Sequence, residues 1–258
     1  STSILRTMFE VSDTAYDNFM GRYSERLGPL FADFAGVQAG QKVLDVGAGT
    51  GALTAELLRR GAAVAAADPS PPFVAALERK FPDADMRAAS AEDLPWPDES
   101  FDAVLAQLVL TFMNDAPAGV AEMRRVTRRG GIVSACMWDR DGMDMLAAVH
   151  RTQRAVADTG TTEARTLYRS RDEIEGLFTG AGFSDVQTEL LEVEREYAGF
   201  DELWGTIADG AGPAGTWVKA LDDETRAKAR EEMYRQVGEP GGAFTLRGRA
   251  WATRATRV

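Results

Sequence analysis

Short apolar runs alternate with segments of helical periodicity through the first half of the chain. The apolar runs fall at 42–46, 62–67, 85–89, 102–108 and 131–138. Helical patterns at 52–60, 71–80 and 115–128 lie between them. Strands separated by helices are typical of βαβ units, whose parallel sheet is covered by helices on both faces. The pattern therefore predicts an α/β fold.

After residue 138 the regular alternation of short apolar runs with helical segments stops. Helices are predicted near 143–158 and 171–180, and strands near 183–197 and 243–256. The last strand alternates apolar with polar positions from Phe244 onwards, which is typical of a half-buried antiparallel strand. A helical segment at 198–240 has glycine-rich joints at 205–215 and 238–242. These joints indicate either mobile connections or a lid over a substrate, and we favour the lid because long inserts in compact domains are usually functional or disordered.

Residues 43–51 read Val-Leu-Asp-Val-Gly-Ala-Gly-Thr-Gly, and a helical pattern follows at once. Glycines at this spacing let the backbone turn sharply and let a ligand touch the main chain, with free helix N–H groups pointing at it. Gly47, Gly49 and Ala52 also satisfy the G-x-G-x-x-G/A dinucleotide pattern. However, the negative charge of Asp45 is unfavourable beside a pyrophosphate and suits a cationic or amino-bearing ligand better.

The stretch Asp-Val-Gly-Ala-Gly-Thr-Gly resembles the first motif of class I S-adenosylmethionine-dependent methyltransferases. Further segments resemble other motifs of that family, and they lie at 16–24, 65–70, 91–102 and 123–131. The resemblance covers most of residues 12–138. It implies a Rossmann-like, doubly wound, seven-stranded and mostly parallel sheet with a reversed C-terminal hairpin and helical lid insertions.

We expect one methyltransferase domain over residues 1–258. Its predicted parts are an N-terminal helical cap at 1–40, a cofactor-binding core at 41–138, lid or substrate insertions at 139–168 and 198–240, and a C-terminal helix with sheet-closing strands at 169–197 and 241–258.

The resemblance implies S-adenosylmethionine as cofactor, with S-adenosylhomocysteine as product. The residues that it places at the cofactor are Asp45, Gly47, Ala48, Gly49, Gly51, Asp68, Pro69, Ser90, Ala91, Glu92, Gln107 and Leu108, together with Tyr16, Met20 and Arg22 from the N-terminal segment.

Several of these residues have a second interpretation. Asp45 would lie near the amino-acid tail of the cofactor, or it caps N–H groups of the loop. Asp68 would accept hydrogen bonds from the ribose hydroxyls, or it too caps the loop. Gln107 would border the sulfonium with Leu108, or it is buried against backbone partners.

The remaining residues carry weaker signals. Pro69 would pack against the adenine, and the backbone of 91–92 would contact its edge. Ser90 stands where relatives often carry an acid, so its contact with the adenine amine would be weaker. Tyr16 and Met20 fit a core-facing stripe, although the resemblance turns them towards the cofactor. Arg22 would bind the cofactor carboxylate or remain a solvated charge.

No catalytic residue is predicted. Methyl transfer from a sulfonium requires in-line placement of the acceptor, and a general base only where the acceptor must lose a proton early. His150, the sole histidine, is expected to be structural. Asp139, Asp141 and Asp144 are expected in a solvated loop after the fifth strand, or Asp141 is expected to cap the following helix, and no metal site is predicted.

Composition narrows the class of partner. The net charge of −11 disfavours nucleic acid and anionic membranes, both of which need a basic surface. Cys136 is the only cysteine, so an internal disulfide is excluded and a reducing compartment is compatible. No apolar run is long enough to span a membrane, and the first residues do not resemble a secretory signal. We therefore expect a cytoplasmic protein.

Taken together, the sequence predicts methyl transfer from S-adenosylmethionine to a small-molecule acceptor by in-line displacement. The alternatives are an NAD(P)-dependent oxidoreductase on a Rossmann-like fold, and a non-catalytic S-adenosylmethionine-binding protein. The identity of the acceptor, the methylated atom and the oligomeric state stay open.

Overall fold

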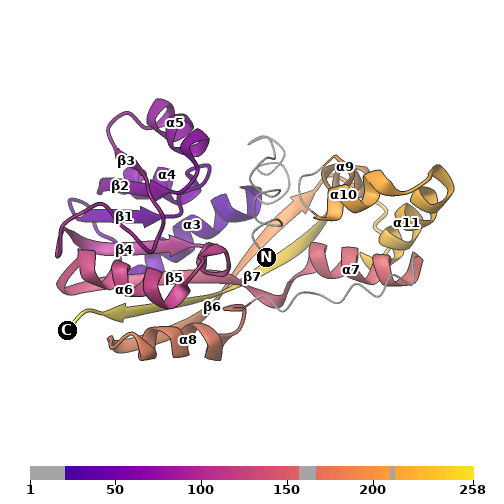
Figure 1. Cartoon of the computed structure of the whole chain (residues 1–258). Coiled ribbons are helices and arrows are strands. Elements are labelled where there is room, and N and C mark those ends of the chain that lie inside the picture. The colour runs from indigo at the N-terminus through magenta and orange to yellow at the C-terminus, as the bar shows by residue number, and fades with distance from the viewer. Residues whose placement is uncertain (1–20, 157–166, 210–212) are drawn as a thin grey trace. The chain divides into compact units, whose positions relative to one another are not determined.

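The computed structural model describes residues 21–156, 167–209 and 213–258 (Figure 1). These residues form two compact units. The core unit comprises residues 24–139, 167–191 and 250–258. The helical unit comprises residues 21–23, 140–156, 192–209 and 213–249.

One seven-stranded sheet has the order β3-β2-β1-β4-β5-β7-β6. Its strands are β1 (Lys42–Val46), β2 (Ala63–Asp68), β3 (Asp85–Ala88), β4 (Phe101–Gln107), β5 (Thr127–Met143), β6 (Ser184–Tyr197) and β7 (Phe244–Thr256). Strands β1 to β5 pair in parallel, and β6 and β7 form the reversed hairpin. The predicted Rossmann-like, mostly parallel sheet is confirmed.

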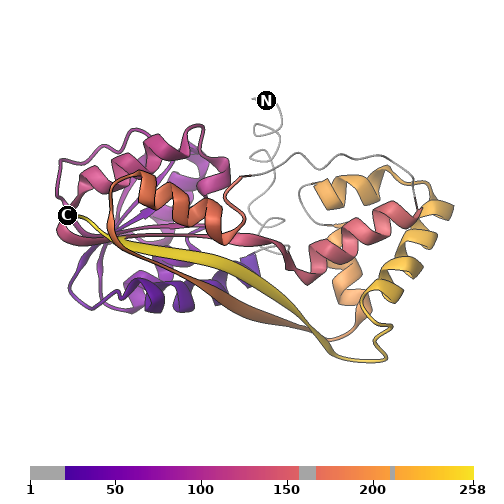
Figure 2. The same cartoon turned by 90° about the horizontal axis from the view of Figure 1, so that it is seen from below.

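Helices cover both faces of the sheet in the core unit. They are α3 (Arg22–Ala35), α4 (Ala52–Arg59), α5 (Pro71–Lys80), α6 (Ala116–Val126) and α8 (Arg171–Gly180), with a 3₁₀ turn η2 (Leu110–Phe112) after β4. Figures 1 and 2 show α6 and α8 on one face, and α3, α4 and α5 on the other.

This layering follows from the two-residue period of the strands. Alternate side chains such as Leu44 and Val104 pack in one core cluster with Val120 and Met123 of α6. Side chains that point the other way form a smaller cluster, in which Ala66 of β2 packs near α5. The apolar strands are therefore buried on both faces, as the sequence predicts for a parallel sheet.

Strand β5 differs from its prediction, because it runs beyond both ends of 131–138. The strand continues through the glycine pair 130–131, which lies in a local irregularity where the register with β4 shifts between Phe101 and Ala103. A Cβ on Gly131 would lie 2.7 Å from the carbonyl oxygen of Asp102, so glycine allows the two backbones to approach. Asp139 and Asp141 consequently belong to β5, so the expectation that they lie in a loop is wrong. The alternative that Asp141 caps a helix is wrong as well, because α7 begins only at Asp144.

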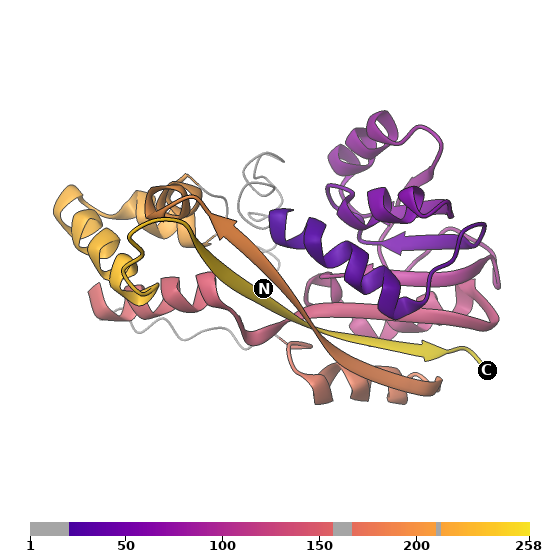
Figure 3. The ribbon, with the colours of Figure 1, turned by 180° about the vertical axis from the view of Figure 1, so that it is seen from behind.

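The helical unit contains α7 (Asp144–Val156), α9 (Phe200–Ala208), α10 (Pro213–Ala220) and α11 (Asp223–Gln236). In Figure 3, α7 is rose-red, and α9, α10 and α11 run from orange to gold. Helix α7 packs on α11, and α9 packs on α10. Between α7 and α11, the Thr152 hydroxyl donates a hydrogen bond to Sδ of Met233 over 3.5 Å.

The helical character predicted for 198–240 is therefore confirmed, but the first predicted joint is too long. Gly205 lies inside α9 and Gly215 inside α10. Burial of Leu203 and Ile207 on one face of α9 explains why the helix continues past Gly205. The lid role of this segment, and the predicted division of the chain into cap, core and insertions, stay predictions. Within the described ranges, no helix is both long and apolar enough to cross a membrane.

Candidate functional site

The carboxyl ends of β1, β2, β3 and β4 lie at one edge of the core sheet, because these strands are parallel. Strand β1 pairs with β2 on one side and with β4 on the other. The strand order thus reverses at β1, and ligands of open α/β sheets bind at the carboxyl edge of such a switch point. All the predicted site residues between 45 and 108 lie on these strands or in the loops that follow them.

The glycine loop after β1 is tied to the end of β2. The backbone N–H groups of Gly47 and Ala48 both donate to the carbonyl oxygen of Ala67, at 2.8 and 3.1 Å. Gly51 then forms the N-cap of α4 with a φ of 86°. Its missing Cβ makes room for α5, since a Cβ there would lie 2.6 Å from Cδ2 of Leu77.

The three glycines of the loop have different surroundings. A Cβ on Gly47 would lie 2.4 Å from Cγ2 of Val109, so the absence of a side chain is needed for packing there, as at Gly51. A Cβ on Gly49 would meet nothing within 4 Å. Gly49 is therefore the position of the loop where the backbone faces open space that a ligand could occupy.

Asp68, the last residue of β2, connects this loop to the start of α5. Its Oδ2 accepts a hydrogen bond from the Gly49 N–H at 2.9 Å, and its Oδ1 accepts one from the Ser70 N–H at 2.8 Å. Burial raises the pKa of the Asp68 carboxyl, and the two N–H donors oppose that shift. The loop-capping interpretation is thus observed, yet each carboxylate oxygen can accept a further hydrogen bond. The ribose role stays a prediction.

Asp45, on β1, is 1% exposed. Its Oδ2 accepts a hydrogen bond from the Thr54 hydroxyl of α4 at 2.7 Å. Burial raises the pKa of Asp45 to about 7, the Thr54 hydrogen bond lowers it in part, and the charge of Asp68 raises it further. The partner is thus a helix side chain, which the sequence reasoning missed; Thr54 in the first turn after the glycine loop was the available signal.

The loop after β3 holds Ser90, Ala91 and Glu92. Ala91 is buried in the main core cluster. Oε1 of Glu92 accepts a hydrogen bond from the Asp115 N–H at 3.0 Å, next to the start of α6. Burial acts to raise the pKa of Glu92, but hydrogen bonds from the Asp115 amide and the Ser90 hydroxyl outweigh it, so the pKa lies below its usual value.

Strand β4 ends at Gln107, whose Nε2 donates to the carbonyl oxygen of Ser24 in α3 at 3.1 Å. The predicted backbone partner of Gln107 is thus present. Leu108 follows with a φ of 62°, which is rare for a leucine. Such backbone strain costs about 1–3 kcal/mol and tends to occur at functional sites. The sequence gives no signal for it.

The remaining predicted residues are less informative. Tyr16 and Met20 lie outside the described residues. Arg22 is 56% exposed and pairs with Glu202 at 3.3 Å within the helical unit. Pro69 is exposed directly after Asp68. The predicted contacts of all these residues with a cofactor stay predictions.

Two aspartates after residue 138 have structural partners. Oδ1 of Asp139 accepts a hydrogen bond from Nε1 of Trp251 at 2.8 Å. Asp144 opens α7, and its Oδ2 accepts a hydrogen bond from the Arg247 N–H at 2.9 Å. Among the residues that the structure describes, no group of three or more His, Cys, Asp or Glu side chains could hold a metal ion.

Comparison with known proteins gives one family model, described as methyltransferase domain, which matches residues 44–135. The Mycobacterium tuberculosis protein described as uncharacterized protein Rv1403c is 30% identical over 210 residues, which cover 79% of this chain and 76% of that protein. A demethylmenaquinone methyltransferase of Beutenbergia cavernae is 43% identical over 99 residues, covering 38% of this chain and 41% of its own.

Among solved structures, a geranyl diphosphate methyltransferase in complex with SAM aligns with a TM-score of 0.55. It is 16% identical and covers 92% of this chain and 87% of its own. At this identity the likeness concerns the fold.

Proposed function

Because this chain belongs to the class I S-adenosylmethionine-dependent methyltransferases, we propose that it methylates a small organic acceptor and binds the methyl donor at the carboxyl edge of β1 to β4. The donor site is supported chiefly by Gly49, which faces open space while its N–H is held by the buried Asp68. A backbone bend fixed in this way leaves room for a ligand without the cost of ordering the loop on binding.

We assign the donor contacts as follows. The backbone of 47–51 lies along the amino-acid tail of the donor. Asp68 keeps the hydrogen bonds from its two backbone N–H donors and accepts hydrogen bonds from the ribose hydroxyls with its remaining lone pairs. The loop at 90–92 borders the adenine, and Gln107 and Leu108 border the sulfur. Each assignment fits the observed position of the residue at one edge of the sheet.

Asp45 has a distinct part in this proposal. Burial raises the pKa of its carboxyl to about 7, so the charge of Asp45 changes near neutral pH. An ammonium group near it favours the ionised form. The amino group of the donor would therefore be bound most tightly when Asp45 is ionised, and Thr54 would hold the carboxylate in place by its hydrogen bond.

When bound, the donor supplies a methyl group already activated by the positive charge on its sulfur. The residues of the chain then have to fix the donor, exclude water and hold the acceptor in line with the methyl group. A general base is needed only for an acceptor that loses its proton early, and we assign none.

The acceptor proposal is supported by charge. The net charge of −11 argues against a nucleic acid as acceptor, because binding a nucleic acid needs a basic surface. A relative that matches this chain over 99 residues is named demethylmenaquinone methyltransferase, which supports a small acceptor.

We further propose that the protein works in the cytoplasm. Its one cysteine, Cys136, is buried, and burial raises the pKa of the thiol, so it is suited to a structural role.

Incubation of the protein with a cell extract and methyl-labelled S-adenosylmethionine tests the acceptor class. The extract is then separated into small molecules, protein and nucleic acid, with heat-denatured protein as the control. We expect label in the small-molecule fraction alone. Label in the nucleic-acid fraction would contradict the proposal, and no transfer to any fraction would favour a protein that binds the donor without catalysis.

A further inference from the structure

Two carboxyl groups are buried on neighbouring strands at the carboxyl edge of the sheet. Asp45 of β1 is 1% exposed, and Asp68 of β2 is 5% exposed. Asp45 pairs in register with Ala66, and Asp68 lies two residues further along β2, so both side chains point to the same face of the sheet. Because like charges repel more strongly away from water, the charge of either carboxyl opposes ionisation of the other.

The two carboxyls differ in the groups that stabilise their charge. Asp68 accepts hydrogen bonds from the backbone N–H groups of Gly49 and Ser70. Among the described residues, the donor to Asp45 is Thr54 of α4, whose hydroxyl lies 2.7 Å from Oδ2 and whose backbone N–H also lowers the pKa of the carboxyl. Thr54 carries no charge. A fully buried carboxyl whose donors come from one neutral residue is expected to take up a proton readily.

The elements packed against β1, which are β2, β4 and α4, provide no cation for Asp45 within the described residues. The titratable side chains of these elements and of β1 are Lys42, Asp45, Asp68, Asp102, Glu56 and Arg59. Lys42 and Asp102 lie at the opposite, amino ends of their strands, and the cation of α4 is paired within its own helix. On β5, burial and the charge of Asp45 raise the pKa of the Cys136 thiol, which is therefore uncharged. Asp68 is thus the charged group that acts on Asp45, and it raises the pKa of that carboxyl.

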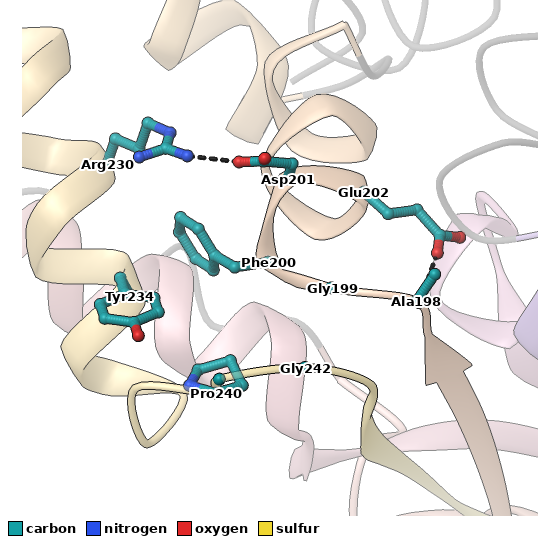
Figure 4. A pocket seen from close by; sticks show the side chains of 10 residues that line it. Ala198, Gly199, Phe200, Asp201, Glu202, Arg230, Tyr234, Pro240 and Gly242 are labelled. Atoms are coloured by element: carbon teal, nitrogen blue, oxygen red, sulfur yellow. Dashed lines mark hydrogen bonds and ion pairs between the residues drawn. The ribbon is translucent and has the colours of Figure 1, made fainter.

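Carboxylates elsewhere in the chain show the ordinary arrangement. In the helical unit, Asp201 pairs with Arg230, and Glu202 accepts a hydrogen bond from the Ala198 N–H at 2.8 Å (Figure 4). In the core unit, the buried Glu56 is paired with arginines, whose hydrogen bonds hold its pKa below the usual value. Asp45 differs from these three carboxylates, because its burial is not offset by a cation.

A positively charged group on a ligand would complete this site. Asp45 lies two residues before Gly47, the first residue of the loop to which we assign the amino-acid tail of the donor. That tail carries an ammonium group, and an opposite charge within about 4–6 Å favours the ionised form of a carboxyl. The ammonium group and a proton therefore compete for Asp45, and each weakens the binding of the other by the same factor.

We propose that binding of the methyl donor displaces a proton from Asp45, so that the affinity for the donor rises with pH. The O–H bond of the carboxyl breaks, its electron pair stays on the oxygen, and the proton passes to the solvent. The ammonium group of the donor keeps its own protons. The inference rests on the proposed function, because it requires the donor at the glycine loop, and it adds a regulation by pH to that site.

The first test uses the unaltered full chain and S-adenosylhomocysteine, which carries the same amino-acid tail. Calorimetric titration at about pH 7 in phosphate and in Tris, whose ionisation enthalpies differ, counts the protons released. We expect on the order of half a proton per site at this pH, and an affinity that rises about tenfold from about pH 6 to about pH 8. Binding without buffer dependence and with constant affinity would overturn the inference and leave the proposed function intact. Absence of binding at every pH would overturn both.

The second test identifies the group that releases the proton. Asp45→Asn should bind S-adenosylhomocysteine with an affinity that does not vary with pH, and should release no proton. Thr54→Val should move the rise in affinity to higher pH, whereas Thr54→Ser, which keeps the hydroxyl, should leave it in place.

The control for these variants is Glu56→Gln, which removes another buried carboxyl of the same region that is already ionised in the free protein. It should keep the proton release of the unaltered chain. Proton release that persists in Asp45→Asn would overturn the proposal. If Asp45→Asn does not fold, the shift caused by Thr54→Val decides, and an unshifted pH profile in that variant would count against Asp45.

Discussion

Asp45→Asn should change how the stability of the protein depends on pH. Asp45 is fully buried, its pKa is raised from 3.8 to about 7, and its hydrogen-bond donor is Thr54. Asparagine has nearly the same shape and keeps an acceptor oxygen for Thr54, but it does not titrate. The substitution therefore isolates the cost of ionising a buried carboxyl.

The sign follows from linkage. Because the folded-state pKa is the higher one, the stability that the protonated form provides is complete below pH 3.8 and is lost as the pH rises through about 7. In that interval each pH unit costs about 1.4 kcal/mol. Integrated from about pH 5 to about pH 8, the loss is about 2.5 kcal/mol.

Urea denaturation of both proteins across this pH range measures the effect. Carboxylates with lowered pKa values, such as Glu56 and Glu92, act in the opposite direction but are common to both proteins. The difference in unfolding free energy, variant minus unaltered chain, should rise by about 2.5 kcal/mol from about pH 5 to about pH 8. A difference that stays constant within about 0.5 kcal/mol would refute the reasoning.

Three further substitutions test the same edge of the sheet. Thr54→Val removes the hydrogen-bond donor to Asp45 and should raise the pKa of that carboxyl by about one unit. The pKa is measured by ¹³C NMR of the carboxyl carbon, and an unchanged pKa would contradict the hydrogen bond. Gly47→Ala places a Cβ against Val109 and should destabilise the protein by about 1–3 kcal/mol, part of which Val109→Ala should recover in a double-mutant cycle; purely additive effects would exclude the clash. Asp68→Ala should weaken S-adenosylhomocysteine binding by about 1–3 kcal/mol in calorimetry, and equal affinity would exclude the ribose role.

Much of the core fold could be predicted from the sequence, because its signals are local. Strand β1 and helices α5 and α8 lie at the predicted residues. Each has an apolar period with clear ends, such as the glycines after β1 or Ser70 before Pro71. The glycine loop was also recognisable, since glycine spacing directly reflects backbone geometry.

The partners of the site residues could not be predicted in the same way. The Gln107–Ser24 contact joins residues 83 positions apart, and Asp139–Trp251 joins residues 112 positions apart. Which groups meet over such separations depends on packing, and the left-handed backbone of Leu108 likewise results from its surroundings. The sequence identifies the candidate functional groups, whereas the packing of the folded chain determines which partner each group has.

The central claim is that the donor lies against the bare backbone of Gly49, and calorimetric titration with S-adenosylhomocysteine tests it most directly. Gly49→Ala is compared with Gly182→Ala, because both glycines have a positive φ (55° and 75°) and open space around the missing Cβ. We expect the unaltered chain and Gly182→Ala to bind S-adenosylhomocysteine equally, Gly49→Ala to bind it at least about tenfold more weakly, and NAD to give no heat. Equal affinity of the two variants, or binding of NAD in place of S-adenosylhomocysteine, would contradict the account.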